Sequence, residues 1–471
     1  MTVYSIFIYV GIAAVLLTAL RYFIARPQNW LVCYLQNFVG SLFIFSGFVK
    51  AVDPLGTGYK MHEYFEAFAG EGLRPFWEWI ANYSTYMSII MIAAELFFGF
   101  ALIIGWQRRF TITIIWWLTL FFTLLTGYTY LSGYGITHAF ILLAIVLTVL
   151  FAIVSLPTDT RRRNRILIVG VILLLINAAL GKFTGMYFTK EFEEAGMKVT
   201  DCGCFGDFIK LKPWETFYKD VFLDVLILIL VLGVREIKPV FGNKVNGALA
   251  GVAAVAASFL CLYTTYWGEP IIDFRPYAIG NNIEELRHEK VPAKIDMLFT
   301  YKNKKTGEEK NYKMDELAKV NNDEEVFVKR KDVVLDPGIP ARVLGLNIMD
   351  EDGNEVTDDL LTDPNYTLMV VTWNFKETHE DAFKNLNGLA DAAKKAGIKM
   401  YGVVVNDGHS EEFKQRNGIA YPFYYCDETP IKTMMRSNPG LVLMKNGVIV
   451  NKWHYRHFPT FEELNKEYFK K

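Results

Sequence analysis

Charged residues are scarce in the first part of this chain. Of the 49 basic and 50 acidic residues, 36 lie within positions 1–265 and 63 lie in the remaining 206. This scarcity excludes an ordinary soluble domain for the first part, whereas the second part has the charge content of one. The chain is 52% hydrophobic over 471 residues, too apolar for a wholly soluble protein of this size.

Cysteine is also scarce. The five cysteines lie far apart except for one pair, which excludes a disulfide-rich scaffold. The net charge of −1 gives no reason to expect nucleic acid as a partner. The first 20 residues lack a basic n-region and a small-residue cleavage site, so we expect a retained transmembrane helix and no signal peptide. A transporter is disfavoured, since neither an internal repeat nor a pair of interrupted helices is evident.

Long apolar segments predict about eight transmembrane helices, because each is close to the length that crosses about 30 Å of hydrocarbon. The segments are Tyr4–Leu20, Leu35–Val52, Tyr83–Gly105, Phe110–Leu131, Gly135–Leu156, Ile166–Gly181, Phe217–Val234 and Ala248–Thr265. Aromatic residues recur at helical spacing in Tyr59–Phe68, which predicts an amphipathic helix at the membrane interface, with Trp77 and Trp79 in an aromatic belt.

Basic residues predict the orientation of these spans, since Lys and Arg accumulate in cytoplasmic loops. Basic clusters follow the first, third, fifth and seventh spans, at Arg21, Arg108, Arg161 and Arg235 and their neighbours. All four clusters therefore fall on one side. We expect the N-terminus, the loop after the sixth span and everything after the eighth span to lie outside, in the periplasm of a bacterial inner-membrane protein.

The loop Asp201–Asp207 contains two cysteines, Cys202 and Cys204, separated by one glycine. A disulfide between them closes a very small ring, and departure from relaxed geometry makes such a bond more reducible. This pattern favours a redox-active pair, with one of the two thiolates as nucleophile. A structural disulfide bracing the loop and two unpaired thiols remain alternatives. No nearby Cys or His completes a metal site, and no His follows for haem attachment.

Two further cysteines, Cys261 and Cys426, are expected on the same outer side, where either could relay electrons to the pair. Single cysteines are more often buried apolar residues. Cys33 is expected at the cytoplasmic end of the second span, out of reach.

Ionisable residues inside membrane spans are costly and mark candidate functional groups. Four fall in the outer half of the predicted spans: Lys50, Glu95, His138 and Asp224. Lys50 is placed to pair with Glu95, while His138 and Asp224 are expected near the starts of their spans. These groups are either a structural ion-pair network or a proton path that serves thiol–quinone exchange.

The second half predicts a mixed α/β domain. A hairpin is expected at Ile295–Met314 and another at Gly345–Thr357. Further strands are expected at Tyr366–Trp373, Lys399–Val405, Phe423–Tyr425, Leu441–Met444 and Val448–Trp453, and helices at Glu380–Ala396, Glu411–Asn417 and Phe461–Phe469. This order predicts a mixed sheet with helices on both faces.

The element order, with Ser437–Leu443 before the penultimate strand, resembles a thioredoxin-like fold in which Pro439 is the cis-proline beside the redox site. Thioredoxins place a Trp-Cys-x-x-Cys motif after the first core strand, but this chain reads Trp373-Asn374-Phe375-Lys376-Glu377. Without either cysteine, the domain is not an independent dithiol oxidoreductase. The resemblance implies a surface that binds extended chains, formed by Trp373, Asn374, Glu377, Asn438 and Pro439.

The first half resembles the DoxX family and its relative MauE. The matching features are Gly40–Lys50 leading to Asp53-Pro54, Glu95 followed by Gly99 and Gly105, and the Cys202–Gly206 loop. The whole layout is similar to the long DoxX-type proteins of Bacteroidota. MauE is linked to disulfide formation in a periplasmic enzyme and DoxX relatives to thiosulfate and quinone oxidoreduction, so the resemblance implies a redox role.

These observations predict a transmembrane domain at residues 1–265, a β-rich periplasmic connector at 266–341 and a thioredoxin-like periplasmic domain at 342–471. The first functional hypothesis is thiol–disulfide exchange with a periplasmic client, with a membrane quinone as candidate electron acceptor. The second is a non-catalytic assembly subunit whose thioredoxin-like domain binds envelope proteins. Either protein would contact membrane lipid, and either could work inside a larger complex.

Overall fold

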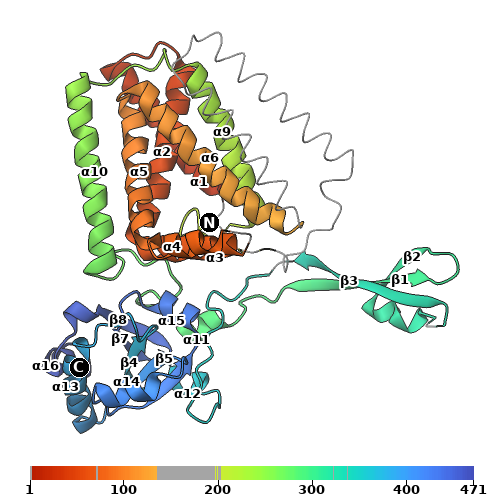
Figure 1. The fold of residues 1–471 in the computed structure, drawn as a ribbon, viewed down its shortest axis with the longest axis vertical. Coiled ribbons are helices and arrows are strands. Elements are labelled where there is room, and N and C mark those ends of the chain that lie inside the picture. Colours follow the sequence, from red (N-terminus) through yellow and green to blue (C-terminus); the bar gives the residue numbers. More distant parts are fainter. Residues whose placement is uncertain are drawn as a thin grey trace. The chain divides into compact units, whose positions relative to one another are not determined.

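A computed structural model describes residues 3–70, 73–134, 197, 199, 203–209, 211–321, 323–336 and 338–470. The chain divides into two compact units, Met1–Ile272 and Asp273–Lys471 (Figure 1). The predicted spans Gly135–Leu156 and Ile166–Gly181, together with Cys202 and His138, lie outside the described residues. The expected boundary between a connector and a thioredoxin-like domain, at residues 341 and 342, stays a prediction.

Five helices of the described part of the first unit are long and apolar enough to cross a membrane. They are α1 (Val3–Ile24), α2 (Trp30–Val52), α5 (Ser84–Ile104), α6 (Arg108–Ser132) and α10 (Asn243–Tyr266). They coincide with the first four predicted spans and the eighth. The total of eight spans stays a prediction.

The seventh predicted span forms helix α9 (Pro213–Leu232), which starts earlier than expected. Pro213 occupies the first turn, and the Glu215 side chain accepts from the Lys212 backbone N–H, so the helix begins ahead of the apolar run. Asp224 consequently lies in the middle of α9 and not near its start. With Glu215, Lys219, Asp220 and Asp224 on one helix, α9 is more highly charged than the five spans.

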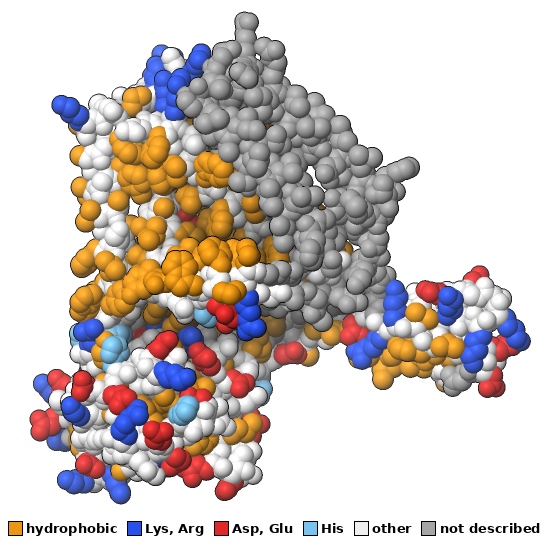
Figure 2. Space-filling model, in the orientation of Figure 1, with side chains coloured by type: hydrophobic (Ala, Val, Ile, Leu, Met, Phe, Trp, Pro, Cys, Tyr) orange, Lys and Arg blue, Asp and Glu red, His pale blue; other side chains and the backbone are white. Residues whose placement is uncertain are grey.

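The basic loops come together at one end of the helical unit. The Arg21 guanidinium donates to the Lys238 carbonyl at 2.9 Å, and Arg108 donates to the Ile237 carbonyl at 2.6 Å. The connections after α1, α5 and α9 therefore meet, and Figure 2 shows the Lys and Arg side chains gathered there. The predicted orientation depends on basic residues that follow alternate spans, and these three basic loops do lie at one end of the helices.

The carboxyl end of α5 is held at this same basic end by side chains from three other helices. Gln36 of α2 donates to the Leu102 carbonyl, Arg21 of α1 to the Ile103 carbonyl and Asn246 of α10 to the Ile104 carbonyl. The last carbonyls of a helix have no partner within the helix. These side chains help to satisfy them, together with the backbone N–H groups of Gly105 and Val240, which also donate to the Leu102 and Ile104 carbonyls.

The opposite end carries two further helices, α3 (Pro54–Ala69) and α4 (Arg74–Ala81). Helix α3 contains the predicted amphipathic segment. Around α4, the side chains of Leu73, Phe76 and Trp79 are exposed. Figure 2 shows an apolar band across this end of the helical unit. The Thr264 hydroxyl donates to the Ala51 carbonyl at 3.1 Å, which brings the carboxyl ends of α10 and α2 together at this end.

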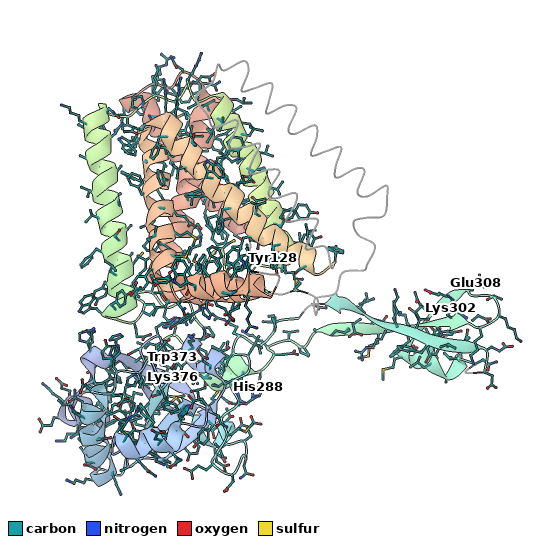
Figure 3. All side chains as sticks on the ribbon, viewed as in Figure 1. Tyr128, His288, Lys302, Glu308, Trp373 and Lys376 are labelled. Carbon is teal, nitrogen blue, oxygen red and sulfur yellow. The ribbon has the colours of Figure 1, made fainter. Side chains whose placement is uncertain are left out.

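The second unit contains a three-stranded antiparallel sheet in the order β2-β1-β3, in the region predicted to be a connector. Its strands are β1 (Lys294–Asn303), β2 (Glu309–Lys313) and β3 (Glu325–Asp336). The pairing of β1 with β2 confirms the first predicted hairpin, whose strand and turn residues Lys302 and Glu308 are marked in Figure 3. Strand β3 was not predicted, because the charged run Lys329–Asp332 interrupts its alternation of apolar and polar residues.

A five-stranded mixed sheet forms the rest of this unit, in the order β6-β5-β4-β7-β8. Its strands are β4 (Tyr366–Thr372), β5 (Lys399–Val405), β6 (Phe423–Cys426), β7 (Gly440–Lys445) and β8 (Val448–His454). β4, β5 and β6 run parallel, while β7 pairs antiparallel with both β4 and β8. The mixed sheet and its five strands are as predicted.

Two apolar clusters cover the two faces of this sheet, because successive residues of a strand point to opposite sides. Met369 and Val371 belong to one cluster, whereas Leu368 and Val370 belong to the other. The helices are α11 (Ile283–Arg287), α12 (Thr357–Leu361), α13 (Ala382–Lys395), α14 (Ser410–Arg416), α15 (Glu428–Met434) and α16 (Phe461–Leu464), the last continued by a π-helical turn at Asn465–Phe469.

The second predicted hairpin is much shorter than expected. Its first arm forms only isolated bridges, in which Met349 pairs with Glu355 and with Tyr425, and Thr357 begins α12. The Asp350 carboxylate accepts from the backbone N–H groups of Asp352 and Asn354, so the turn forms as expected. The Thr357 hydroxyl binds the Ile348 backbone, which ends strand pairing after one bridge.

A candidate site of buried ion pairs and a cysteine loop

An ion pair between α2 and α5 lies inside the helical unit. The Lys50 ammonium nitrogen is 2.6 Å from Glu95 Oε1, and the two side chains are only 4% and 2% exposed. Lys50 also lies over the Phe122 ring of α6, 4.9 Å from its centroid. The predicted Lys50–Glu95 pair is thus present, with an aromatic face that further stabilises the buried cation.

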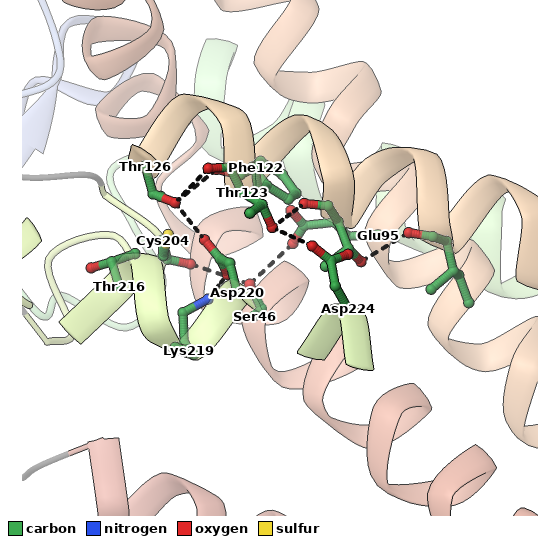
Figure 4. Close-up of polar contacts among 12 residues, drawn as sticks. Ser46, Glu95, Phe122, Thr123, Thr126, Cys204, Thr216, Lys219, Asp220 and Asp224 are labelled. Atoms are coloured by element: carbon green, nitrogen blue, oxygen red, sulfur yellow. Dashed lines mark hydrogen bonds and ion pairs between the residues drawn. The ribbon is translucent and has the colours of Figure 1, made fainter. Parts of the chain in front are cut away.

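Ser46 of α2 connects this pair to the cysteine loop. Its hydroxyl oxygen is 3.1 Å from Glu95 Oε2 and 3.2 Å from the carbonyl oxygen of Cys204 (Figure 4). Ser46 precedes Lys50 by one helical turn, so both side chains point from α2 toward the same carboxylate.

A second set of charges enters from α9. The Lys219 ammonium pairs with the neighbouring Asp220 carboxylate, and Asp220 also accepts from the Thr126 hydroxyl of α6 at 3.1 Å. One turn further along α9, the Asp224 carboxylate accepts from Thr123 at 2.7 Å. Threonines along one face of α6 thus supply the hydrogen bonds that let these acids lie against that helix.

The described part of the cysteine loop, residues 203–209, packs against α2. Gly203 and Gly206 both have positive φ, 59° and 52°, and the Gly206 N–H donates to the Gly203 carbonyl at 3.0 Å. This tight turn allows Phe205 to be buried, with its ring centroid 5.9 Å from that of Phe45. Cys204 is half-buried as a result, so the loop is less exposed than its polar sequence indicates.

Among the described residues, two small cavities meet at this loop. One, of about 30 Å³, is lined by charged residues of the cluster, namely Lys50, Glu95, Lys219 and Asp220, and by Cys204. The other, of about 40 Å³, is mainly apolar and lies between α3, α5 and α6. Lys50, Phe122 and Cys204 line both, so an apolar chamber and a charged chamber adjoin one cysteine. Each chamber has room for a few water molecules.

Sequence reasoning found Lys50, Glu95, Cys204 and Asp224 but missed the residues that join them. Lys219 and Asp220 lie within the predicted seventh span, and their charge was the available signal. Ser46 and Thr126 carried no such signal, because Ser and Thr are common in membrane helices and only their placement distinguishes them.

The other predicted thiols, Cys261 of the first unit and Cys426 of the second, are buried among apolar side chains. Cys261 of α10 is buried among Ala51, Ile89 and Ile92. Cys426 ends β6, an edge strand separated from β4 by β5, and is buried in a sheet cluster. Burial, with Asp427 nearby, raises the pKa of the Cys426 thiol to about 12. Neither sulfur is presented to solvent for a relay.

The predicted binding residues of the second unit converge at one end of β4. The Asn438 amide donates to the Asn374 carbonyl at 2.6 Å and accepts from the Trp373 N–H at 3.3 Å. The Asn374 side chain in turn accepts from the Glu377 N–H at 3.2 Å. Pro439 follows in a cis peptide and leads into β7. Figure 3 marks Trp373 and Lys376 in this loop.

No group of three His, Cys, Asp or Glu side chains in the described ranges is arranged to hold a metal ion. The charged cluster instead consists of compensating pairs, in which each acid is matched by a lysine or a threonine hydroxyl.

Comparison with known proteins gives one similarity. Residues 28–137 match the family described as methylamine utilisation protein MauE. The match covers α2, α3, α4, α5 and α6, which include Ser46, Lys50 and Glu95. Over this range the first unit is similar to MauE, and its long apolar helices are those of a multi-pass membrane protein. No curated protein and no solved structure matches the chain.

Proposed function

We propose that this chain is an inner-membrane redox protein whose Cys202–Cys204 pair exchanges disulfides with a periplasmic client and passes the electrons to a membrane quinone. The observation that carries the proposal is the placement of Cys204 beside the buried ionisable groups Lys50, Glu95, Lys219 and Asp220. Thiol–disulfide chemistry moves protons together with electrons, so ionisable groups beside a redox cysteine have a direct use.

The proposed reaction balances in two steps. A client dithiol attacks the Cys202–Cys204 disulfide through a mixed disulfide, leaving a client disulfide and two reduced thiols in the loop. The loop thiols then give two electrons and two protons to a quinone, which becomes a quinol while the loop disulfide reforms. In this scheme Glu95, paired with Lys50, accepts and returns protons, and Asp224 and His138 extend the path.

Two arrangements in the structure support the proposed topology. The basic loops meet at one end of the helices, which we assign to the cytoplasm by the bias of Lys and Arg. The Cys204 loop contacts α2 at Ser46, near the other end, which we assign to the periplasm, an oxidising compartment that permits disulfides. The MauE similarity supports a membrane-embedded role for the first unit.

The second unit would dock the client. Its strand order, with parallel β4 and β5 beside antiparallel β7 and β8, supports the assignment of a thioredoxin-like fold. Such a domain can bind an extended chain near Trp373, Asn374, Glu377, Asn438 and Pro439 without possessing a dithiol. The loop of the first unit would then supply the dithiol that the second unit lacks.

The test is the reduction potential of the Cys202/Cys204 pair in the full chain, measured by thiol alkylation and mass spectrometry across a redox-buffer series. A potential above roughly −250 mV is expected for an exchangeable pair, whereas a pair below about −300 mV would be structural. Cys202→Ser and Cys204→Ser should each trap a mixed disulfide with a client. Cys33→Ser, which changes a cysteine at the basic end of α2, is the matched control and should trap nothing.

A second candidate function is a membrane-anchored assembly subunit with no redox activity. It is favoured by the second unit, where Cys426 is the sole cysteine and is buried. A structural loop disulfide together with envelope proteins that still bind the Asn374–Asn438 surface would support this alternative.

A further inference from the structure

Ser46 has one hydroxyl proton but faces two acceptors. Glu95 Oε2 lies 3.1 Å from its oxygen and the Cys204 carbonyl oxygen lies 3.2 Å from it. A hydroxyl can donate only one hydrogen bond at a time, while its own lone pairs can accept. With Glu95 ionised, both partners are pure acceptors, so Ser46 can satisfy only one of them.

The charge of Glu95 decides which partner receives the proton. An ionised carboxylate is the stronger acceptor, because hydrogen bonds to charged groups are roughly twice as strong as neutral ones. Ser46 then donates to Glu95, and the Cys204 carbonyl loses this donor. When Glu95 is protonated on Oε2, it donates to the Ser46 oxygen, and the Ser46 proton is available to Cys204. Glu95, Ser46 and Cys204 then form a continuous hydrogen-bonded chain.

We propose that Ser46 is a positioning residue that couples the protonation of Glu95 to the position of the Cys204 loop. A protonated Glu95 holds the loop against α2, and an ionised Glu95 releases it. The inference deepens the proposed redox function, on which its biological meaning depends. It would synchronise proton uptake beside the thiol with the exposure of that thiol.

The surroundings of Glu95 determine how such a switch can operate. The charged or titratable groups that face Glu95 in the charged chamber are Lys50 from α2, Lys219 and Asp220 from α9 and Cys204 from the loop. Lys60 from α3 lines the adjoining apolar chamber. Cys261 from α10 packs near the same part of α5 as Glu95. From α6, Thr119 and Phe122 line the charged chamber. Protonation of Glu95 removes the counterion of Lys50 and leaves its cation over the Phe122 ring, which compensates for the lost charge only in part.

The test is the alkylation rate of Cys204 as a function of pH, in the full chain in lipid nanodiscs. A Cys202→Ser background prevents ring closure, and each rate is divided by that of a small model thiol at the same pH. This normalised rate should rise by about 2- to 10-fold from low to high pH, the equilibrium factor of one hydrogen bond.

Three variants separate coupling from mere packing. Ser46→Ala should remove this pH-dependent rise, called the step below, and hold the normalised rate at its high-pH level. Glu95→Gln, whose amide can donate to Ser46 at every pH, should hold it at the low-pH level. Ser46→Thr keeps the hydroxyl and should restore the step. A step that survives in Ser46→Ala or in Glu95→Gln overturns the proposal, as does a wild-type rate without any step.

The readout does not require redox turnover. A loop disulfide that proves non-exchangeable would refute the proposed function and leave the Ser46 step unchanged. An exchangeable pair without the step would refute the coupling alone.

Discussion

Gly40 and Gly99 lie backbone to backbone where α2 crosses α5. A Cβ added to Gly40 would lie 2.8 Å from the Gly99 carbonyl oxygen, and one added to Gly99 would lie 2.9 Å from the Gly40 carbonyl oxygen. Small residues allow such close approach of membrane helices. This contact sets the spacing of the two helices that carry Lys50 and Glu95.

The first prediction concerns this contact. Gly99→Ala should lower the stability of the helical unit by about 1–3 kcal/mol, because the added methyl group meets backbone atoms that cannot rotate away. Thermal unfolding in detergent would measure the loss. Gly251→Ala in α10 is the control, because a Cβ there meets no atom within 4 Å, and it should be neutral or slightly stabilising. Equal effects of the two substitutions would contradict the packing argument.

The second prediction concerns the ion pair. Lys50→Met or Glu95→Leu alone should each destabilise the unit by about 3–5 kcal/mol, because each leaves a buried charge without its counterion. The double variant should lose much less than the sum of the two single losses. A thermal double-mutant cycle on the purified full chain measures the coupling. Additive losses would show that the two charges do not depend on each other.

The third prediction concerns pH and Asp273, in the second unit. Burial alone would raise the pKa of this carboxyl group, but Arg275 and then Lys452 outweigh burial and hold the pKa below its usual value. Arg275 Nε donates to Asp273 at 2.7 Å, and Lys452 donates to it at 2.5 Å. Since the folded-state pKa is lowered, the carboxylate stabilises the fold above the unfolded-state value of about 3.9, and this stabilisation is lost as the pH falls below it.

Asp273→Asn should therefore cost about 3 kcal/mol at neutral pH, and the difference from wild type should shrink as the pH falls below about 4. Hydrogen exchange of the β7 and β8 amides in the full chain would measure this difference in stability at each pH. The control is Asp381→Asn, which removes an exposed pair with Lys384 and should change little at any pH. A difference that stays constant down to low pH would count against the charge argument.

The fourth prediction concerns Cys426. Because burial raises its pKa to about 12, this thiol should resist alkylation in the folded protein at pH 8 and react readily in denaturant. Peptide mass spectrometry would compare the two conditions, with Cys204 as the half-buried internal reference. Rapid labelling of Cys426 in the folded chain would reopen its candidacy as a relay thiol.

The sequence predicted much of the architecture because its signals are strong and local. Apolar length located the five membrane helices and α9, and short runs of β-branched, aromatic and other apolar residues located all five strands of the mixed sheet. Strand β3 was missed because Lys329–Asp332 interrupts its alternation. The second hairpin was overpredicted because the Asp350 turn forms without continuing into paired strands.

The candidate site could be predicted only in part, for a physical reason. An intramembrane charge such as Glu95 is conspicuous because it is costly, and its pairing with Lys50 follows from their depth. A serine hydroxyl costs little free energy at any position of a membrane helix, so the sequence does not mark Ser46. Its bridging position depends on tertiary structure alone. The burial of the Cys204 loop likewise depends on the packing of Phe205 against Phe45, a contact between residues 160 positions apart in the sequence.

The three donors at the end of α5 bear on how the chain is assembled during synthesis. Arg21 and Gln36 are already in the membrane when α5 emerges, and they can bind its last carbonyls at once. Asn246 belongs to α10 and is translated more than 140 residues after Ile104, its partner. Before then the Ile104 carbonyl can bind the Val240 N–H, which donates to it at 2.9 Å in the finished fold. Helix α10 therefore adds a second bond to the end of a helix made much earlier, and a chain truncated before residue 246 lacks that bond.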